Sequence, residues 1–514
     1  RLLAYDITGD TPALLGSVAV EGTPRELLLR GDRALVIGQA GAETPVDVVG
    51  GGPVATTVAP KVSTAVTRVT EVAIADPAKM TISRTLTVDG SYVTGRLTGG
   101  TARIVLNTPP EITTTDAPTP TPVPMPGAAA AAAGPGLTSF VPRTVLHSNI
   151  TNRTFERPLV GCGQVYRPVR YSGLDLLTVL TVDLDKGLFN VDRDAVLAGA
   201  ETVYASEGSL YVASRRYIPA FDSPADVPAS MTTEIHRFDA SQPDRTRYAA
   251  SGSVPGFVLN QFALSEWQGD LRVATTEDPL WLNGAQQRDS ESGVSVLRQD
   301  GGKLVQIGRA GGLGTGERIY AVRFLGDRGY VVTFRQVDPL YTLDLADPKR
   351  PRVAGELKIA GYSAYLHPVG DDLLLGVGQD ATEQGMRAGA QVSLFDVSDP
   401  ASPRRLQQRA FGSATSSDAE WDHLAFLWWG PTSLAMLPLQ QYAGTPFTGA
   451  VGLRVRRTGI DEVGRVTHGD TPYPTVVRRS FVAGGRVITL SDRGIAANRL
   501  DTLSPLGFTA FPAG

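Results

Sequence analysis

The sequence predicts an all-β fold, a single large β-propeller of about eight four-stranded blades, within a range of about seven to nine. Three observations lead to this prediction. Apolar runs recur in pairs joined by Gly-Asp or Gly-Gly turns, a pattern typical of β-hairpins because these residues reach the positive φ angles of tight turns. An Asp-Pro turn follows several of the hairpins. Almost no segment has the 3.6-residue apolar period of a surface helix, which argues against helical repeats.

The hairpins follow one another along nearly the whole chain. Clear copies are "YAVRFLGDRGYVVTF" from Tyr320 and "RRSFVAGGRVITLSD" from Arg478. The segment "YTLDLADPKRPRVAGELKIAG" from Tyr341 is interpreted as a third strand, an Asp/Pro turn and a fourth strand, because Asp accepts backbone hydrogen bonds and Pro presets φ. The turn glycines of eight hairpins lie 44 to 109 residues apart, at Gly31, Gly99, Gly208, Gly269, Gly326, Gly370, Gly430 and Gly484. A repeat of four strands is typical of a propeller blade.

The order of elements departs from a plain repeat at two places. Residues 1–22 are interpreted as the third and fourth strands of a blade without its first hairpin, and complete blades run from about residue 23 to 514. A ring with this extra half-blade and a ring in which residues before Arg1 complete another blade both agree with the pattern. A mostly irregular insertion within one blade is expected at 108–166. Its Thr/Pro- and Ala-rich part at 108–136 is expected to be a disordered loop.

Composition excludes several classes of protein. The 514 residues carry a net charge of −4 and are 42% hydrophobic, which allows a large core but not the broad basic surface of a non-specific nucleic-acid binder. Cys162 is the single cysteine, which excludes an intrachain disulfide and a cysteine-based zinc site. No apolar run reaches the about 18–20 residues that a membrane helix needs. Because the chain begins with Arg1, we expect a signal or anchoring segment to have preceded it.

Three segments carry a resemblance to a known family: "ERIYAVRFLGDRGYVVTFRQVDPLYTLDLADP" (Glu317–Pro348), "GYSAYLHPVGDDLLLGVGQD" (Gly361–Asp380) and "DHLAFLWW" (Asp422–Trp429). Over nearly its whole length the chain resembles the secreted β-propeller-domain proteins of actinobacteria and archaea, which are distantly related to WD40 propellers. The resemblance implies an extracytoplasmic propeller, often membrane-anchored, without an established activity. Members often have two adjacent histidines where this chain has His423 and Leu424, which weakens a two-histidine metal role here.

One position in each hairpin is expected to lie at the central channel, because the first strand of every blade lines it. This ring mixes charged and apolar side chains and forms no uniform catalytic layer. His367 precedes Pro368, which favours an extended conformation. We interpret His367 as a structural or rim-lining residue rather than a ligand or acid–base group. The ring residues, three positions before each turn glycine, are Leu28, Arg96, Ala205, Glu266, Arg323, His367, Leu427 and Phe481.

Weak catalytic candidates are His367, Arg323, Asp422 and His423. A carboxylate near an imidazole can orient it and raise its pKa, which is why Asp422 and His423 are included. Adjacent residues on a strand point to opposite faces, so these two would not touch each other. The sequence lacks the G-x-S-x-G, H-E-x-x-H and P-loop motifs, and we expect no cofactor. A metal site is left open.

Two classes of function remain. The first, which the lack of a convergent acid–base set favours, is an extracytoplasmic, monomeric scaffold. It would bind protein or cell-envelope components through a propeller face and would bind no nucleic acid. The second is a channel-mouth hydrolase or lyase, with or without a metal, that uses Asp422, His423 and nearby arginines. The fold does not decide between them, because propellers host both classes.

Overall fold

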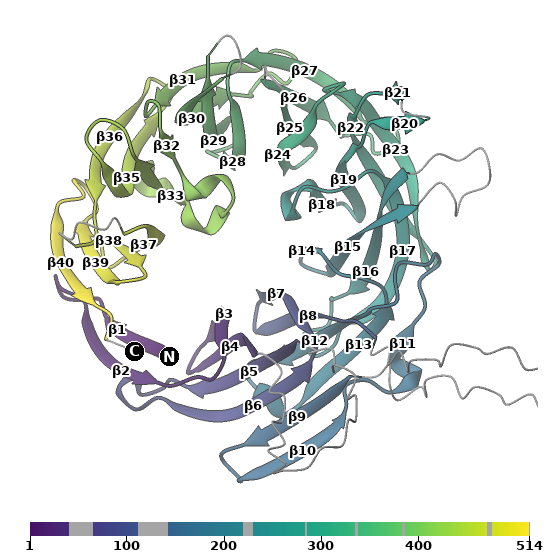
Figure 1. Cartoon of the computed structure of the whole chain (residues 1–514), viewed down its shortest axis with the longest axis vertical. Coiled ribbons are helices and arrows are strands. Elements are labelled where there is room, and N and C mark those ends of the chain that lie inside the picture. Colours follow the sequence, from purple (N-terminus) through teal and green to yellow (C-terminus); the bar gives the residue numbers. More distant parts are fainter. Residues whose placement is uncertain are drawn as a thin grey trace, which may run out of the picture.

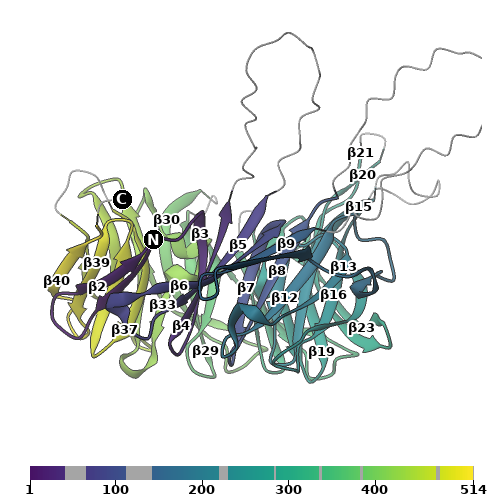
Figure 2. The same cartoon turned by 90° about the horizontal axis from the view of Figure 1, so that it is seen from below.

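The computed structural model describes residues 1–40, 65–110, 142–218, 230–282, 285–334, 338–382, 386–469 and 475–512. These residues form a ring of β-sheets around a central channel (Figure 1), and the predicted all-β propeller is confirmed. Figure 2 shows the ring edge-on as a disc. Helices in the described residues are short 3-10 turns, and none of them is long and apolar enough to cross a membrane.

The described strands group into eight antiparallel units of four strands, which is consistent with the predicted number of blades. The inner strands, nearest the channel in Figure 1, are β3 (Thr23–Arg30), β7 (Ser91–Thr98), β14 (Thr202–Ala205), β18 (Leu264–Trp267), β24 (Arg318–Leu325), β28 (Tyr362–Pro368), β33 (Leu427–Trp429) and β37 (Val477–Ala483). The second strands are β4 (Arg33–Ala40), β8 (Thr101–Thr108), β15 (Ser209–Ile218), β19 (Asp270–Glu277), β25 (Arg328–Phe334), β29 (Leu373–Ala381), β34 (Leu434–Gln441) and β38 (Arg486–Ser491).

Two further strands complete each unit. The third strands are β5 (Val66–Ala73), β12 (Leu176–Asp183), β16 (Ser230–Asp239), β22 (Glu291–Asp300), β26 (Asp338–Asp344), β30 (Arg387–Asp396), β35 (Phe447–Arg456) and β39 (Gly494–Arg499). The outer strands are β6 (Thr81–Asp89), β13 (Val191–Leu197), β17 (Arg247–Pro255), β23 (Lys303–Leu313), β27 (Arg352–Ile359), β31 (Arg404–Ala410), β36 (Gly459–Val466) and β40 (Pro505–Ala510).

Local turn chemistry explains where the strands end. Gly326, between β24 and β25, has a φ of 53°, in the left-handed region that glycine adopts without a steric penalty. In the β33–β34 hairpin the residue in the left-handed region is Ser433, with a φ of 52°, which follows the 3-10 turn η9 (Gly430–Thr432). Between β30 and β31, Asp396 accepts hydrogen bonds from the amide (3.1 Å) and the hydroxyl (2.7 Å) of Ser398. Such Asp-centred turns reverse the chain between third and outer strands.

The core lies between neighbouring blades, because the middle strands bury side chains on both faces. On β8 and β12, Val105 and Val179 pack towards the third blade, whereas Ile104 and Leu180 pack towards the first. All four side chains are fully buried. Burial of one such side chain stabilises the fold by about 1.5–3 kcal/mol. Each blade is therefore held by both neighbours, and its inner strand is fixed at the channel.

Part of the expected insertion forms a β-hairpin. β9 (Arg143–Ser148) and β10 (Arg153–Pro158) extend the first blade beyond the outer edge of β6. Residues 142–158 are thus more regular than we expected, because β9 alternates exposed and buried side chains and fits the free edge of a sheet. Of the low-complexity part at 108–136, residues 111–136 lie outside the described residues.

The structure also contains short strands and 3-10 turns outside the four strands of each unit. The short strands are β11 (Val165–Tyr166), β20 (Leu280–Leu282), β21 (Ala285–Arg288) and β32 (Thr415–Ser416). The 3-10 turns besides η9 are η1 (Pro77–Lys79), η3 (Cys162–Gln164), η4 (Gly187–Phe189), η6 (Gln261–Ala263), η7 (Asp418–Glu420) and η8 (His423–Ala425).

Residues 1–22, interpreted above as a half-blade, contain β1 (Leu2–Asp6) and β2 (Ala13–Val18), which lie between the last and the first blade (Figure 1). These two strands pair with each other and with no other described strand. Side chains make the contacts on both sides: Ala4 packs against the core of the first blade and Tyr5 against that of the last. Within the described residues the ring therefore closes through side-chain packing, without a sheet shared by the first and last blades.

Candidate functional site at the channel mouth

Two 3-10 turns carry polar side chains to the channel. η6 (Gln261–Ala263) precedes β18, and η8 (His423–Ala425) precedes β33. Each turn begins at an N-cap: the side chains of Asn260 and Asp422 accept backbone amide hydrogen bonds from two residues further on, at 3.0 and 3.1 Å. Capping fixes the start of a turn because it satisfies an amide that has no other partner. The local sequence thereby sets the directions of Gln261 and His423.

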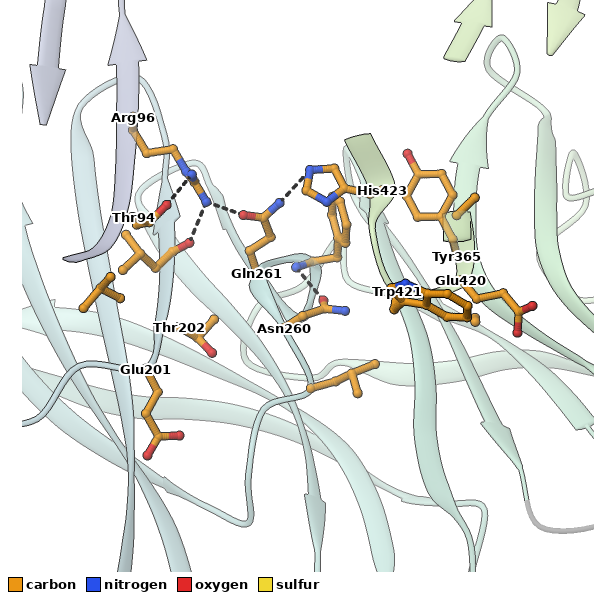
Figure 3. Close-up of a pocket in the computed structure, with 16 residues that line it drawn as sticks. Thr94, Arg96, Glu201, Thr202, Asn260, Gln261, Tyr365, Glu420, Trp421 and His423 are labelled. Atoms are coloured by element: carbon orange, nitrogen blue, oxygen red, sulfur yellow. Dashed lines mark hydrogen bonds between the residues drawn. The ribbon is translucent and has the colours of Figure 1, made fainter. Parts of the chain in front are cut away.

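Gln261 connects Arg96 of the second blade with His423 of the seventh. Arg96 donates a hydrogen bond to Gln261 Oε1, and Gln261 Nε2 lies 3.2 Å from His423 Nε2 (Figure 3). The second terminal nitrogen of Arg96, Nη1, donates to the hydroxyl of Thr94 at 2.7 Å and to the carbonyl of Gly95 at 2.9 Å. This hydrogen-bonded chain joins three segments that come from different blades.

The chain also specifies the protonation state of His423. Arg96 orients the Gln261 amide with its oxygen towards the guanidinium, so the amide nitrogen faces the imidazole as a donor. His423 Nε2 must then accept, which requires a neutral imidazole. Burial lowers the pKa of His423, and nearby arginines, Arg96 among them, act in the same direction against Asp422. Both observations indicate an uncharged His423 at neutral pH.

A second cluster surrounds Arg323 on β24. Its guanidinium carbon lies 4.3 Å from the ring centre of Phe262 and 5.5 Å from that of Tyr365, and its Nε donates to the carbonyl of Leu366 at 2.9 Å. The Tyr365 hydroxyl lies 3.1 Å from His367 Nδ1. Burial, followed by repulsion from Arg323, lowers the pKa of His367 to about 4. His367 is thus held neutral within a wall of aromatic side chains.

We expect the variant His367→Gln to fold and to lose at most about 1–2 kcal/mol of unfolding free energy. Glutamine keeps a polar group within reach of the Tyr365 hydroxyl, and one hydrogen bond contributes about this much. Urea unfolding would measure the loss. Calorimetric titration with Zn²⁺ and with Ca²⁺ should give the same result for variant and parent. A stoichiometric metal site that the parent has and the variant lacks would show that His367 is a ligand.

Asp422 and His423 have different partners, and they do not lie on a strand. That expectation was wrong: both belong to the capped turn of η8, which an aspartate N-cap favours locally. Oδ1 of Asp422 caps the turn, and Oδ2 forms an ion pair of 2.7 Å with Arg479 on β37. The side chain of Leu424, at the position of the second histidine discussed above, is exposed.

Two hollows flank Gln261. One, of about 330 Å³, is lined by Arg96, Arg323, Phe262 and Tyr204 among others. The other, of about 300 Å³, lies on the side of His423 and Trp421 (Figure 3) and also contains Arg96 and Gln261. Among the described residues, Arg96 and Arg323 form no ion pair with a carboxylate. The wall of the first hollow therefore combines aromatic surface with two arginines that form no ion pair with a described carboxylate.

Sequence reasoning identified part of this cluster. Arg96, Arg323 and His367 come from the predicted channel ring, and His423 from the predicted Asp-His pair. Gln261 was missed, although Asn260 before it is a recognisable N-cap. The other ring residues also lie on inner strands, but they do not join the hydrogen-bonded cluster. No group of three potential metal-binding side chains (His, Cys, Asp or Glu) occurs within the part of the chain that the structure describes.

Comparisons with known proteins agree with the fold. A family model described as "Beta propeller domain" matches residues 1–503. An uncharacterized protein of Methanocaldococcus jannaschii is 42% identical over 194 residues, which cover 38% of this chain and 29% of that protein. One from Archaeoglobus fulgidus is 43% identical over 189 residues, covering 37% and 27%. The matched region thus spans less than a third of either relative.

A solved structure with a similar fold is the β-propeller domain of the Trilobed protease from Pyrococcus furiosus. It is 10% identical and covers 71% of this chain and 92% of that one, with a TM-score of 0.28. This likeness carries no argument about function.

Proposed function

The chain belongs to the β-propeller-domain family, and from this premise we propose that it is a non-catalytic scaffold that binds an anionic group of a protein or cell-envelope component at the channel mouth. An extracytoplasmic location is part of the proposal and is supported by the resemblance described above. The archaeal relatives are themselves uncharacterized and supply no activity.

The observation that carries the proposal is the pair Arg96 and Arg323 in one hollow. Neither guanidinium has a carboxylate partner among the described residues, and the guanidinium of Arg323 lies over the rings of Phe262 and Tyr365, which also contact each other. Burial lowers the pKa of Arg323, but an arginine remains charged at neutral pH. A partly desolvated guanidinium without a carboxylate partner favours a carboxylate or phosphate, because a planar guanidinium can bind either anion.

The same geometry gives less support to a hydrolase or lyase. Asp422 is occupied by its ion pair and by the cap of η8, and His423 faces an amide instead of a carboxylate. His367 contacts the hydroxyl of Tyr365. A general acid or base needs a partner and a reachable substrate proton, and these side chains do not converge on one point.

Binding can be tested with two labelled anionic probes, a deca-glutamate peptide and poly(glycerol phosphate), with uncharged dextran as the negative control. The double variant R96M/R323M should weaken binding of at least one anionic probe by tenfold or more, about 1.4 kcal/mol, in a fluorescence anisotropy titration. The weakening should diminish as salt rises, because ions screen partly exposed charges. The glutamate and phosphate arms distinguish an acidic protein segment from an envelope polymer.

The matched control is Arg350→Met, which removes the same charge from an exposed arginine on the turn between β26 and β27. It should change affinity by less than about twofold, because Arg350 lies outside the lining of both hollows. Equal losses of affinity in the control and in the double variant would show that binding depends on net charge alone. Failure of both anionic probes to bind the parent would refute the proposal.

A further inference from the structure

The half-blade formed by β1 and β2 lacks the two strands that lie nearest the channel in every complete blade. β2 is its outer strand, and β1 takes the place of a third strand (Figure 1). Among the described strands, β1 pairs only with β2. One edge of β1 is thus an open sheet edge, and such edges readily accept another strand.

The inner strands on both sides of the half-blade leave apolar side chains uncovered. Leu27 and Leu29 of β3 are 45% and 53% exposed, whereas Leu28 between them is 7% exposed and packs towards the second blade. On β37, Phe481 is 38% exposed, whereas Val482 packs towards the seventh blade. Because neighbouring strand residues face opposite ways, the uncovered side chains are on the faces turned to the half-blade.

The inner strands β24 and β28, each between two complete blades, differ from β3 and β37. On β24, the neighbours Ala321 and Val322 are both 3% exposed, and on β28 Tyr365 and Leu366 are 8% and 1% exposed. Both faces of these strands are therefore covered. The exposure on β3 and β37 coincides with the one position in the ring where the described residues supply no inner hairpin.

We propose that this sector binds a two-stranded β-hairpin, apolar on both faces, that pairs with the open edge of β1 and completes a ninth blade. The occupant is a hairpin of the same polypeptide that runs directly into β1. In all eight complete blades the inner hairpin comes immediately before the third strand of its own sheet, and β1 has the position of a third strand. A hairpin in cis also has a much higher effective concentration than a separate one.

To test this proposal, an inner hairpin of this chain, residues 318–334, is fused ahead of Arg1 of the full chain. A short Gly/Ser linker joins the two. Hydrogen exchange of the β1 segment, measured by mass spectrometry, should slow at least tenfold in the grafted protein. A graft whose apolar residues are replaced by serine is the matched control and should leave exchange unchanged. The docking site would be refuted if both grafts slowed hydrogen exchange of β1 equally, or if neither graft slowed it.

A second variant makes the test specific for the uncovered side chains. L29S/F481S should leave β1 exchange unchanged in the ungrafted chain, where both side chains are exposed, but should remove most of the protection that the graft provides. The same loss without a graft would mean that the two residues stabilise the existing fold. The hairpin can also be added as a free peptide at micromolar concentration. If it protects β1 as well as the graft does, the hairpin comes from a separate partner and the proposal of a hairpin in the same polypeptide is refuted.

Discussion

Replacement of Glu71 by alanine should lower the free energy of unfolding by about 3 kcal/mol. Glu71 on β5 is 2% exposed and lies where the first two blades meet. Its carboxylate forms ion pairs with Arg33 (3.3 Å) and Arg84 (2.9 Å) and accepts the amide hydrogen bond of Leu188 (2.8 Å) from the second blade. Loss of one partner of a buried pair typically costs about 3–5 kcal/mol. The lower value applies because both arginines are partly exposed.

The matched control for Glu71 is Asp185→Ala. Asp185 also links the first two blades, through an ion pair of 3.2 Å with Arg30, but both side chains are well exposed. This variant should lose less than about 1 kcal/mol. Urea unfolding followed by circular dichroism would compare the two midpoints. Glu71→Gln keeps an acceptor for the Leu188 amide, so its loss of unfolding free energy should lie between those of Glu71→Ala and Asp185→Ala. Similar small losses of unfolding free energy in all three variants would show that water solvates the ion pairs of Glu71.

Acidification from pH 7 to pH 5 should destabilise the protein, by about 2 kcal/mol through His236 alone. His236 on β16 is fully buried, and burial lowers its pKa to about 4. In the unfolded chain a histidine titrates near 6.5. Between these values the unfolded state binds more protons, so stability is present above about pH 6.5 and is lost as the pH falls towards 4.

His236→Phe should abolish this part of the acid sensitivity. Both ring nitrogens of His236 are buried without a hydrogen-bond partner among the described residues, so no partner is left unsatisfied and stability at pH 7 should change by less than about 1 kcal/mol. His236→Leu is the smaller alternative if phenylalanine overpacks the site. Urea midpoints at pH 7 and pH 5 measure both effects. An acid-induced loss equal to that of the parent would contradict a neutral, buried His236.

His468 provides an informative contrast. Burial lowers its pKa to about 4 as well, but its two nitrogens lie 2.8 Å from the hydroxyl of Ser491 and 2.7 Å from that of Thr489. His468→Phe should also reduce acid sensitivity. Unlike His236→Phe, it should cost about 1–3 kcal/mol at pH 7, because two buried hydroxyls lose their partner.

Local sequence signals determined the architecture of this protein. The turn glycines and the paired apolar runs place all eight inner strands, because a hairpin is specified by its turn and by the alternation of its side chains. The half-blade at residues 1–22 was interpreted from the same signals. The strands β9 and β10 were not anticipated, because their pairing depends on the free outer edge of β6, which is distant in sequence.

The candidate site depended on the closed ring. The channel positions of Arg96, Arg323 and His367 could be predicted, since a strand's place in the blade fixes them. The contact of Gln261 with His423 could not, because 162 residues separate them and only the packing of successive blades brings η6 and η8 together. The exposure of Leu29 and Phe481 could not be predicted either, because it depends on the half-blade next to their strands and not on the sequence of those strands. Hairpins are local and are determined by the sequence alone, whereas side-chain partners across the channel and between blades are determined by how the ring closes.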